Sequence, residues 1–402
     1  MGSALPDVSL TLFFTRAMSL HTWNEIGMFE REVAVYRRLE STLGRIRFVT
    51  YGDRRDRGYS DRLGGIRVHC NRWGMSAQLY RRYLTHALPW AWRGPVIIKS
   101  NQVQGADIAL AAARRGKKPF IARCGYLPSD NMERTYGPDS LQATSAQTLE
   151  RHVFSGANRV VVTTPAMRER VINRYQLPPG RVRVIPNYVD TAVFSPSDGE
   201  DRCPNQVCYV GRLDDEKNPR ALIEAIQGLN IELIMVGSGS LGETLRREVC
   251  DRRLPVTFMG NQQNRELPRL LNRSAAFILP SLIEGHPKAL LEAMSCGVPV
   301  IGANVPGIRE LITDRCTGVL CDPSPEGLRA AITDVLANRD MGAALGSAAR
   351  SYVADRFSLE KVADMEFDLI RELAAERRAT RVFAGEETSQ SLAFEKTQGP
   401  NE

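Results

Sequence analysis

The chain has 402 residues, enough for two or three domains, and its 43% hydrophobic and 25% charged residues are typical of a folded globular protein. No apolar run has the length of a membrane-spanning helix, and the N-terminus lacks the pattern of a signal peptide. The eight cysteines form no C-x-x-C pair, which disfavours metal ligation and favours reduced thiols in a cytoplasmic protein.

The net charge of +7 is unevenly distributed along the chain. Residues 1–190 contain 29 lysines and arginines against 15 acidic residues, whereas the remainder contains 24 against 31. We expect the basic half to attract an anionic partner, such as nucleic acid, an acidic membrane face or a phosphate-bearing acceptor. Because the sequence contains no nucleic-acid-binding module, nucleic acid is not an expected partner.

The N-terminal half alternates short apolar runs with helical patterns, which predicts a doubly wound parallel sheet in a domain of residues 1–195. Strands are expected at residues 10–15, 47–51, 66–70, 95–100, 119–122, 159–163 and 183–186, and helices at 28–39, 106–114, 142–154 and 167–175.

Four polar or flexible positions of this half are candidate acceptor or sugar contacts. The polar loop 16–27 contains His21 and Gly27, and Arg123 follows the strand at 119–122. Asn187 lies in the turn that closes the domain, where it also suits a plain turn or cap. For His21 the alternative is a loop histidine that makes local hydrogen bonds.

Residues 80–92 interleave arginines with tyrosine and tryptophan. This pattern suits a membrane interface or an acidic acceptor. The alternative is a helix packed on the sheet with a solvated arginine face. The polar segment with Asp130, Glu133 and Arg134 is predicted to be a loop that borders the acceptor.

The polar residues 196–205 predict a linker, and residues 206–357 predict a second domain of the same class. Its strands are expected at 207–210, 231–236, 256–259, 275–279, 298–301 and 318–321. Arg212 and Lys217 follow the first strand, where a guanidinium fork and an ammonium group match a diphosphate. Gly211 before them permits close approach of a ligand to the backbone.

The stretch 280–310 combines a strand end, a helix start and two carboxylates, Glu284 and Glu292. Open parallel sheets bind ligands at the carboxyl ends of their strands. We expect both carboxylates to point into that crevice. Beside them lies the helix start at His286, Pro287, Lys288 and Ala289, where the free backbone N–H groups of the three residues other than proline can bind an anion. The alternative is a surface helix with two solvated glutamates.

The segments Glu284–Pro287, Glu292–Met294 and Cys296–Val300, followed by Pro306–Gly307, resemble the donor-site signature of retaining glycosyltransferases of family 4 (glycosyl transferases group 1). The resemblance covers roughly residues 8–376 and is strongest from Val210 onward. It implies the GT-B fold, which is α/β with two Rossmann-like doubly wound domains that face a central crevice. It further implies that residues 358–378 form a helix that crosses back onto the N-terminal domain. Residues 379–402 lack periodicity, and we expect them to be disordered.

The resemblance also assigns roles. Arg212 and Lys217 would stabilise the departing diphosphate, Glu284 and the amides near Gly285 would hold the sugar hydroxyls, and Glu292 would hold the ribose. The turn at Gly237 and Gly239 and the loop at Asn261 would lie beside the nucleotide. In the N-terminal domain the family often has paired glycines where this chain has Gly27 alone. It often has a histidine where this chain has Arg123, whose guanidinium suits a phosphate or an acceptor carboxylate.

The function implied is transfer of a sugar from a nucleoside-diphosphate-sugar to a saccharide or lipid-linked acceptor, in polysaccharide or glycolipid biosynthesis. No cofactor or metal is expected, since the sequence has no Asp-x-Asp motif and its cations can neutralise the diphosphate. We expect a cytoplasmic protein, peripheral on the cytoplasmic membrane face. The alternatives are a nucleotide-sugar epimerase or hydrolase of the same fold, and a non-catalytic relative that binds sugar nucleotide or membrane.

Overall fold

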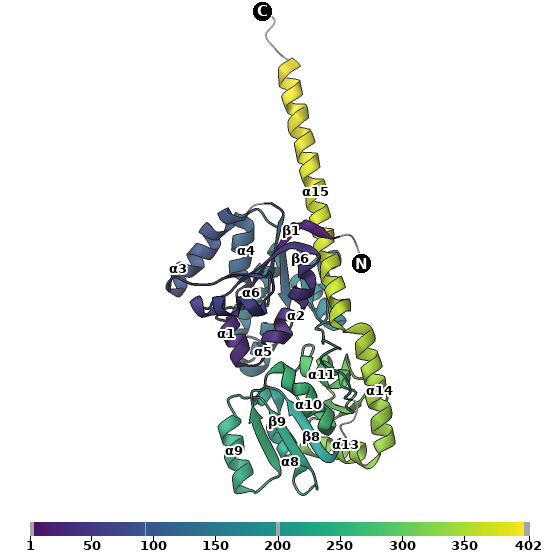
Figure 1. The fold of residues 1–402 in the computed structure, drawn as a ribbon. Coiled ribbons are helices and arrows are strands. Elements are labelled where there is room, and N and C mark those ends of the chain that lie inside the picture. The colour runs from purple at the N-terminus through teal and green to yellow at the C-terminus, as the bar shows by residue number, and fades with distance from the viewer. Residues whose placement is uncertain (1–3, 93, 198–201, 398–402) are drawn as a thin grey trace, which may run out of the picture.

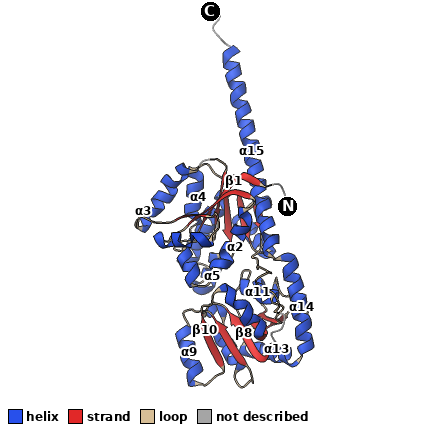
Figure 2. Ribbon diagram, in the orientation of Figure 1, coloured by secondary structure: helices blue, strands red, loops and turns tan. Residues whose placement is uncertain are grey.

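The computed structural model describes residues 4–92, 94–197 and 202–397, and it consists of two α/β domains joined by a long C-terminal helix (Figure 1). Residues 198–201 of the expected linker and 398–402 of the expected tail lie outside the described residues. Each domain has a parallel sheet with helices on both faces (Figure 2).

The N-terminal sheet has seven strands in the order β3-β2-β1-β4-β5-β6-β7, and every pair is parallel. Its strands are β1 Leu5–Phe13, β2 Leu43–Val49, β3 Arg67–His69, β4 Val96–Ser100, β5 Phe120–Cys124, β6 Arg159–Val162 and β7 Val182–Val184. Its helices are α1 Leu20–Glu25, α2 Phe29–Glu40, α3 Ala77–Arg82, α4 Ala106–Arg115, α5 Pro128–Tyr136, α6 Leu141–Gly156 and α7 Pro165–Tyr175.

The C-terminal sheet has six parallel strands in the order β10-β9-β8-β11-β12-β13. Its strands are β8 Cys203–Val210, β9 Glu232–Val236, β10 Val256–Gly260, β11 Ser274–Leu279, β12 Val300–Ala303 and β13 Val319–Cys321. Its helices are α8 Pro219–Ile226, α9 Gly242–Asp251, α10 Leu267–Arg273, α11 Lys288–Ser295, α12 Pro306–Arg309, α13 Pro325–Ala337 and α14 Arg339–Arg356.

The central strands β4, β5, β6, β11 and β12 are largely buried because helices cover both faces of each sheet. In the N-terminal domain one core lies against α1, α2 and the last helix, and the other lies against α4, α6 and α7. In the C-terminal domain the two cores lie against α10, α11 and α14, and against α8, α9 and α13.

Helix α15, Leu359–Thr397, links the end of the C-terminal domain to the N-terminal core. Val362, Phe367 and Ile370 pack into the core beside α2. Figure 1 shows α15 running along the N-terminal domain and extending past it. Helix α15 thus continues to Thr397, whereas the sequence led us to expect disorder from residue 379 onward.

The structure corrects one further local expectation and decides between the two alternatives for another. The polar segment after Arg123 is helix α5 rather than a loop, with Pro128 in its first turn. Its acidic residues Asp130 and Glu133 bind Arg174 of α7 at 2.9 and 3.1 Å and so hold two helices together. In the stretch 80–92, Tyr80, Leu84, Leu88 and Trp92 are buried in the core, which favours the packed helix over an aromatic membrane surface.

Candidate active site

A cavity of about 990 Å³ lies between the two domains, at the carboxyl ends of strands from both sheets. It is lined by most of the positions singled out from the sequence. On the C-terminal side these are Gly211, Arg212, Lys217, Gly237, Gly239, Asn261, Glu284, Gly285, His286, Pro287, Lys288 and Ala289, and on the N-terminal side Gly27, Arg123 and Asn187. Glu292 and His21 are not on its wall.

The best-defined pair in the cavity is Lys217 and Glu284. Lys217 Nζ lies 2.7 Å from Glu284 Oε1, and Ser281 Oγ donates to the same oxygen at 2.7 Å. Both side chains are mostly buried, with 16% and 9% exposed. Lys217 ends a short 3₁₀ helix after β8, and Glu284 follows β11, so two neighbouring strands of the parallel sheet bring them together. The pair offers a cation and a hydroxyl-binding carboxylate side by side.

Arg212 is held less firmly than Lys217. Its guanidinium forms ion pairs with Asp214, at 2.7 Å, and with Glu216, and its side chain is 63% exposed. Both acidic partners lie within four residues of Arg212 in the sequence. A bound diphosphate would compete with these carboxylates for the guanidinium fork.

Glu292 differs from the expectation that both carboxylates face the crevice. Its side chain is 3% exposed, and its carboxylate accepts hydrogen bonds from Asn264 Nδ2 at 3.1 Å and from Arg31 Nη1 at 3.3 Å. Asn264 and Arg31 line the cavity in its place. The physical reason is that α2 of the other domain packs over this turn of α11 and brings Arg31 onto the carboxylate.

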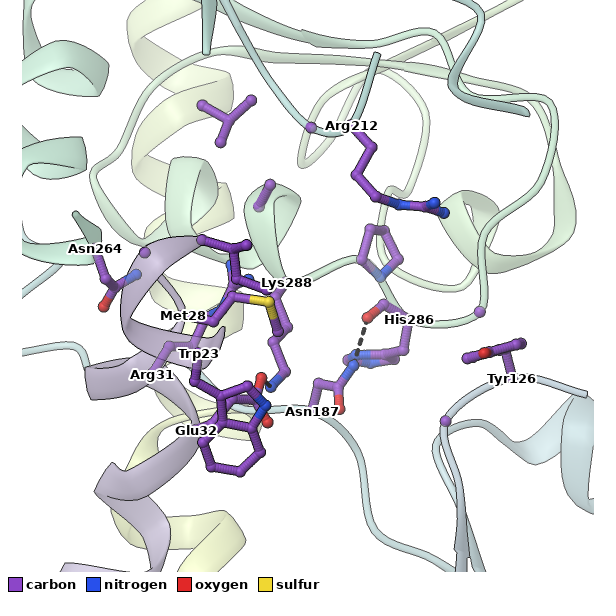
Figure 3. A pocket seen from close by; sticks show the side chains of 18 of the residues that line it. Trp23, Met28, Arg31, Glu32, Tyr126, Asn187, Arg212, Asn264, His286 and Lys288 are labelled. Carbon is purple, nitrogen blue, oxygen red and sulfur yellow. Dashed lines mark hydrogen bonds and ion pairs between the residues drawn. The ribbon is translucent and has the colours of Figure 1, made fainter. Parts of the chain in front are cut away.

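The start of α11 is buried rather than open. Lys288 forms an ion pair with Glu32 of α2, and burial lowers the pKa of Lys288 although Glu32 acts in the opposite direction. Burial raises the pKa of Glu32, but the charges of Lys288 and Arg31 outweigh it and hold that pKa below its ordinary value. Figure 3 shows Lys288 and Glu32 close together beside Met28 and Trp23.

His286 is a neutral, buried histidine between the domains. Burial, with the nearby charges of Arg123 and Lys288, lowers its pKa to about 3. Its carbonyl oxygen accepts a hydrogen bond from Asn187 Nδ2 at 2.6 Å, the dashed line in Figure 3. Its Nδ1 atom is buried and has no hydrogen-bond partner among the described residues. This nitrogen is therefore available to a ligand.

Two glycines let the domains approach closely at the cavity. Gly27 has φ +74°, and a Cβ there would lie 2.1 Å from the carbonyl oxygen of Gln262 in the opposite domain. A Cβ at Gly285 would lie 2.5 Å from the carbonyl oxygen of Gly125, also across the cleft. Neither position accepts a side chain without moving the domains apart.

The structure resolves the two readings of His21 in favour of local hydrogen bonds. Its backbone N–H donates to Asp56 Oδ1 at 3.0 Å, and its Nδ1 lies 3.1 Å from the Tyr59 hydroxyl. Ser19 caps helix α1 here, so the expected loop is helical and the imidazole lies away from the cavity.

Sequence reasoning missed the charged residues of the N-terminal wall, which are Arg31, Glu32, Lys99 and Glu366. One signal was present for Lys99. A lysine inside an otherwise apolar run of a buried strand is unusual unless it is paired, and Lys99 pairs with Glu366 at 2.5 Å. The other three lie on helices whose charged faces resemble ordinary solvated faces.

Two family models together cover most of the chain. The model described as glycosyltransferase family 4 matches residues 34–193, and the model described as glycosyl transferases group 1 matches residues 192–352. This chain belongs to the family 4 glycosyltransferases. The family predicted from the stretch around Glu284 is thereby confirmed.

Curated relatives of this glycosyltransferase include two D-inositol 3-phosphate glycosyltransferases. The one from Frankia alni is 28% identical over 248 residues, which is 56% of this chain and 61% of the relative. The one from Salinispora tropica is 29% identical over 317 residues, 70% of this chain and 65% of the relative. The matches thus span less than two thirds of each relative's length.

Solved structures confirm the predicted GT-B architecture. Anabaena Alr3699/HepE in complex with UDP and glucose has a TM-score of 0.72 and 17% identity, covering 90% of this chain and 99% of that one. Sucrose-phosphate synthase from Thermosynechococcus elongatus has a TM-score of 0.74 and 21% identity, covering 92% and 99%. At these sequence identities the similarity shows only that the fold is shared.

Proposed function

We propose that this protein transfers a sugar from a nucleoside-diphosphate-sugar to a saccharide or lipid-linked acceptor, with retention of the anomeric configuration. The observation that carries the proposal is the Lys217–Glu284 pair at 2.7 Å on the wall of the interdomain cavity. A cation for the leaving diphosphate and a carboxylate for sugar hydroxyls are the two groups that the reaction needs where phosphate and sugar meet.

The donor lies along the C-terminal wall in this proposal. Lys217 and Arg212 stabilise negative charge on the leaving diphosphate without a metal ion, and Arg212 exchanges Asp214 and Glu216 for phosphate oxygens. Glu284 accepts hydrogen bonds from the sugar hydroxyls. Glu292 accepts hydrogen bonds from the ribose hydroxyls, so its carboxylate is shared between the ribose and Arg31. Retention follows if the departing phosphate removes the acceptor proton on the same face; a covalent bond to Glu284 is the alternative.

A screen of UDP-, GDP- and ADP-sugars tests the donor half of the reaction. Alr3699/HepE was crystallised with UDP and with UDP-glucose, so UDP-sugars come first. We expect one donor class to raise the melting temperature and to release nucleotide slowly by hydrolysis, with the same rate in EDTA. The anomeric configuration of the product is then read by NMR.

The screen also distinguishes the alternatives. Hydrolysis or epimerisation with no transfer to any added sugar would favour the hydrolase or epimerase of the same fold. No stabilisation by any sugar nucleotide would reject a catalytic function. Lys217→Met should lower turnover about 10²–10³-fold. Lys361→Met, which changes a lysine on the exposed surface of α15, is the matched control.

We further propose that the protein works at the cytoplasmic face of a membrane, in polysaccharide or glycolipid assembly. The described residues include no helix that is both long and apolar enough to cross a bilayer. Instead, Trp73 and Leu79 are 49% and 55% exposed, beside the exposed Arg72 and Arg82 on the basic N-terminal domain. Exposed apolar groups flanked by arginines suit an anionic lipid surface.

Flotation with vesicles of phosphatidylglycerol and phosphatidylcholine tests this placement. We expect binding at low salt that is lost in the double variant Trp73→Ser/Leu79→Ser. Leu141→Ser is the control, because Leu141 is 83% exposed at a different site, the start of α6. Absence of the wild-type protein from the floated fraction at low salt would refute membrane association.

A further inference from the structure

Three charged side chains on the N-terminal side of the cavity come from segments far apart in the sequence. Lys99 lies in β4, Arg123 in β5 and Glu366 in α15, and all three line the cavity. Lys99 Nζ donates to Glu366 Oε1 at 2.5 Å, and Arg123 Nη1 lies 3.7 Å from the same oxygen. Both cations therefore face one oxygen of the carboxylate.

The other oxygen of Glu366 has no partner. Glu366 is 3% exposed, yet its Oε2 atom forms no hydrogen bond with any of the described residues. Buried carboxylate oxygens are normally hydrogen-bonded, because an unpaired one in a low-dielectric site is unfavourable. Since Glu366 lines the cavity, a hydrogen-bond donor on a ligand is the partner that fits Oε2.

The position of Glu366 points to the acceptor rather than to the donor. The donor groups proposed above, Arg212, Lys217 and Glu284, belong to the C-terminal wall. Lys99 and Arg123 belong to the opposite sheet, and α15 brings Glu366 to them. A ligand group that reaches Oε2 therefore approaches the reacting sugar from the N-terminal side.

We propose that Glu366, with Lys99 and Arg123, forms an acceptor subsite for a neutral hydroxylated ring, a sugar or a cyclitol, one of whose hydroxyls donates to Glu366 Oε2. This inference rests on the proposed transferase function. An ionised carboxylate only accepts hydrogen bonds, so the ligand group must donate. A cationic donor would be repelled by Lys99 and Arg123, and a deprotonated anionic oxygen has no proton to donate to Oε2. A hydroxyl donates without charge, and its oxygen can accept from Lys99, which retains further N–H groups.

The test measures ring binding with the donor site filled. The probes are D-glucose and myo-inositol, and the donor site holds the 2-fluoro analogue of whichever donor stabilises the protein in the screen. Saturation-transfer NMR on the full chain then reports binding outside the donor-sugar position. We expect millimolar binding of at least one ring, weakened at least tenfold by Glu366→Ala. Glu360→Ala, an exposed glutamate on the same helix, should bind as the wild type does.

A second variant controls for misfolding as the cause of lost binding, because Glu366→Ala leaves Lys99 buried without its partner. The double variant Lys99→Met/Glu366→Leu removes both charges and keeps the volume, which proteins often tolerate. It should bind the donor identified in the screen and still fail to bind the ring.

The outcomes separate the two proposals. If no sugar nucleotide binds the wild type, the transferase function fails, and the subsite fails with it. If the donor binds but neither ring does, or if Glu366→Ala or the double variant binds the ring like the wild type, only the acceptor subsite is overturned.

Discussion

The two walls of the cavity are built in different ways. On the C-terminal wall, loops after neighbouring strands carry the functional groups, and Arg212 stays 63% exposed with acidic partners from its own loop. On the N-terminal wall the charges are buried in pairs between distant segments, Lys99 with Glu366 and Glu32 with Lys288 of the C-terminal wall. Arg212 is therefore free to exchange its protein partners for a ligand, whereas these pairs, like Lys217 with Glu284, are fixed by tertiary packing.

Exposed and buried ion pairs also differ in the free energy that is lost when one partner is removed. An exposed ion pair contributes about 0–1 kcal/mol, so a phosphate can displace Asp214 from Arg212 at little cost. Removing one partner of a buried pair costs about 3–5 kcal/mol because it leaves a buried charge unpaired. Two of the buried pairs, Arg31–Glu292 and Glu32–Lys288, join α2 to α11 across the cleft. The N-terminal wall thus also holds the domains together.

The largest expected effect comes from the C-terminal wall. Lys217→Ala should lower kcat about 10²–10³-fold, because loss of one preformed donor to developing charge has that magnitude. Steady-state release of nucleotide measures it, and KM for the donor should change far less. Lys361→Ala is the control. A fall in kcat of less than tenfold would mean that Lys217 only orders Glu284.

The next effect tests whether the two walls cooperate at Glu292. Hydrogen bonds to charged groups contribute about 1.5–3 kcal/mol, so Glu292→Gln should weaken donor binding by about one to two orders of magnitude. Arg31→Gln should weaken it similarly if Arg31 positions the carboxylate for the ribose. Calorimetry of both single variants and the double variant gives the coupling.

Non-additive losses, with the double variant no weaker than Glu292→Gln alone, would show that Arg31 acts through Glu292. Additive losses would mean that the two residues contact the donor independently. A normal donor affinity in Glu292→Gln would remove this residue from the donor site.

The same contrast explains what the sequence could predict. The strands, the Lys217 and Glu284 loops and the helix start at residue 288 follow from local patterns, because parallel strands place their carboxyl ends at one edge. Glu292 could not be placed in this way, since its environment depends on Arg31, which lies 261 positions away. Lys99 and Glu366 are 267 positions apart, and no local pattern links them.

Helices were harder to predict than strands. Helix α5 was taken for a polar loop because its charged residues bind α7 rather than form an apolar stripe. For residues 80–92 the composition left a membrane surface and a packed helix open, and the apolar members pack against the sheet. In both cases the sequence did not reveal the packing partner.

The smallest expected effect concerns His286, which is buried where the two walls meet and lies near a cation from each of them. Burial, then Arg123 and Lys288, lowers its pKa to about 3 in the folded protein, while an unfolded histidine titrates near its ordinary value of about 6.5. Between these values the unfolded chain binds a proton that the folded chain does not. The free energy of unfolding therefore decreases as pH falls through this window, by at most about 1.4 kcal/mol per pH unit from this residue.

His286→Gln should remove that contribution, so its stability should fall less steeply than that of the wild type between about pH 6.5 and 4. Urea unfolding at a series of pH values, followed by circular dichroism, measures the difference between the two slopes. His152→Gln is the control, because His152 lies exposed on α6. Parallel curves for wild type and His286→Gln would show that His286 takes up its proton alike in the folded and the unfolded chain. Burial between the domains and the charges of Arg123 and Lys288 would then not lower its pKa.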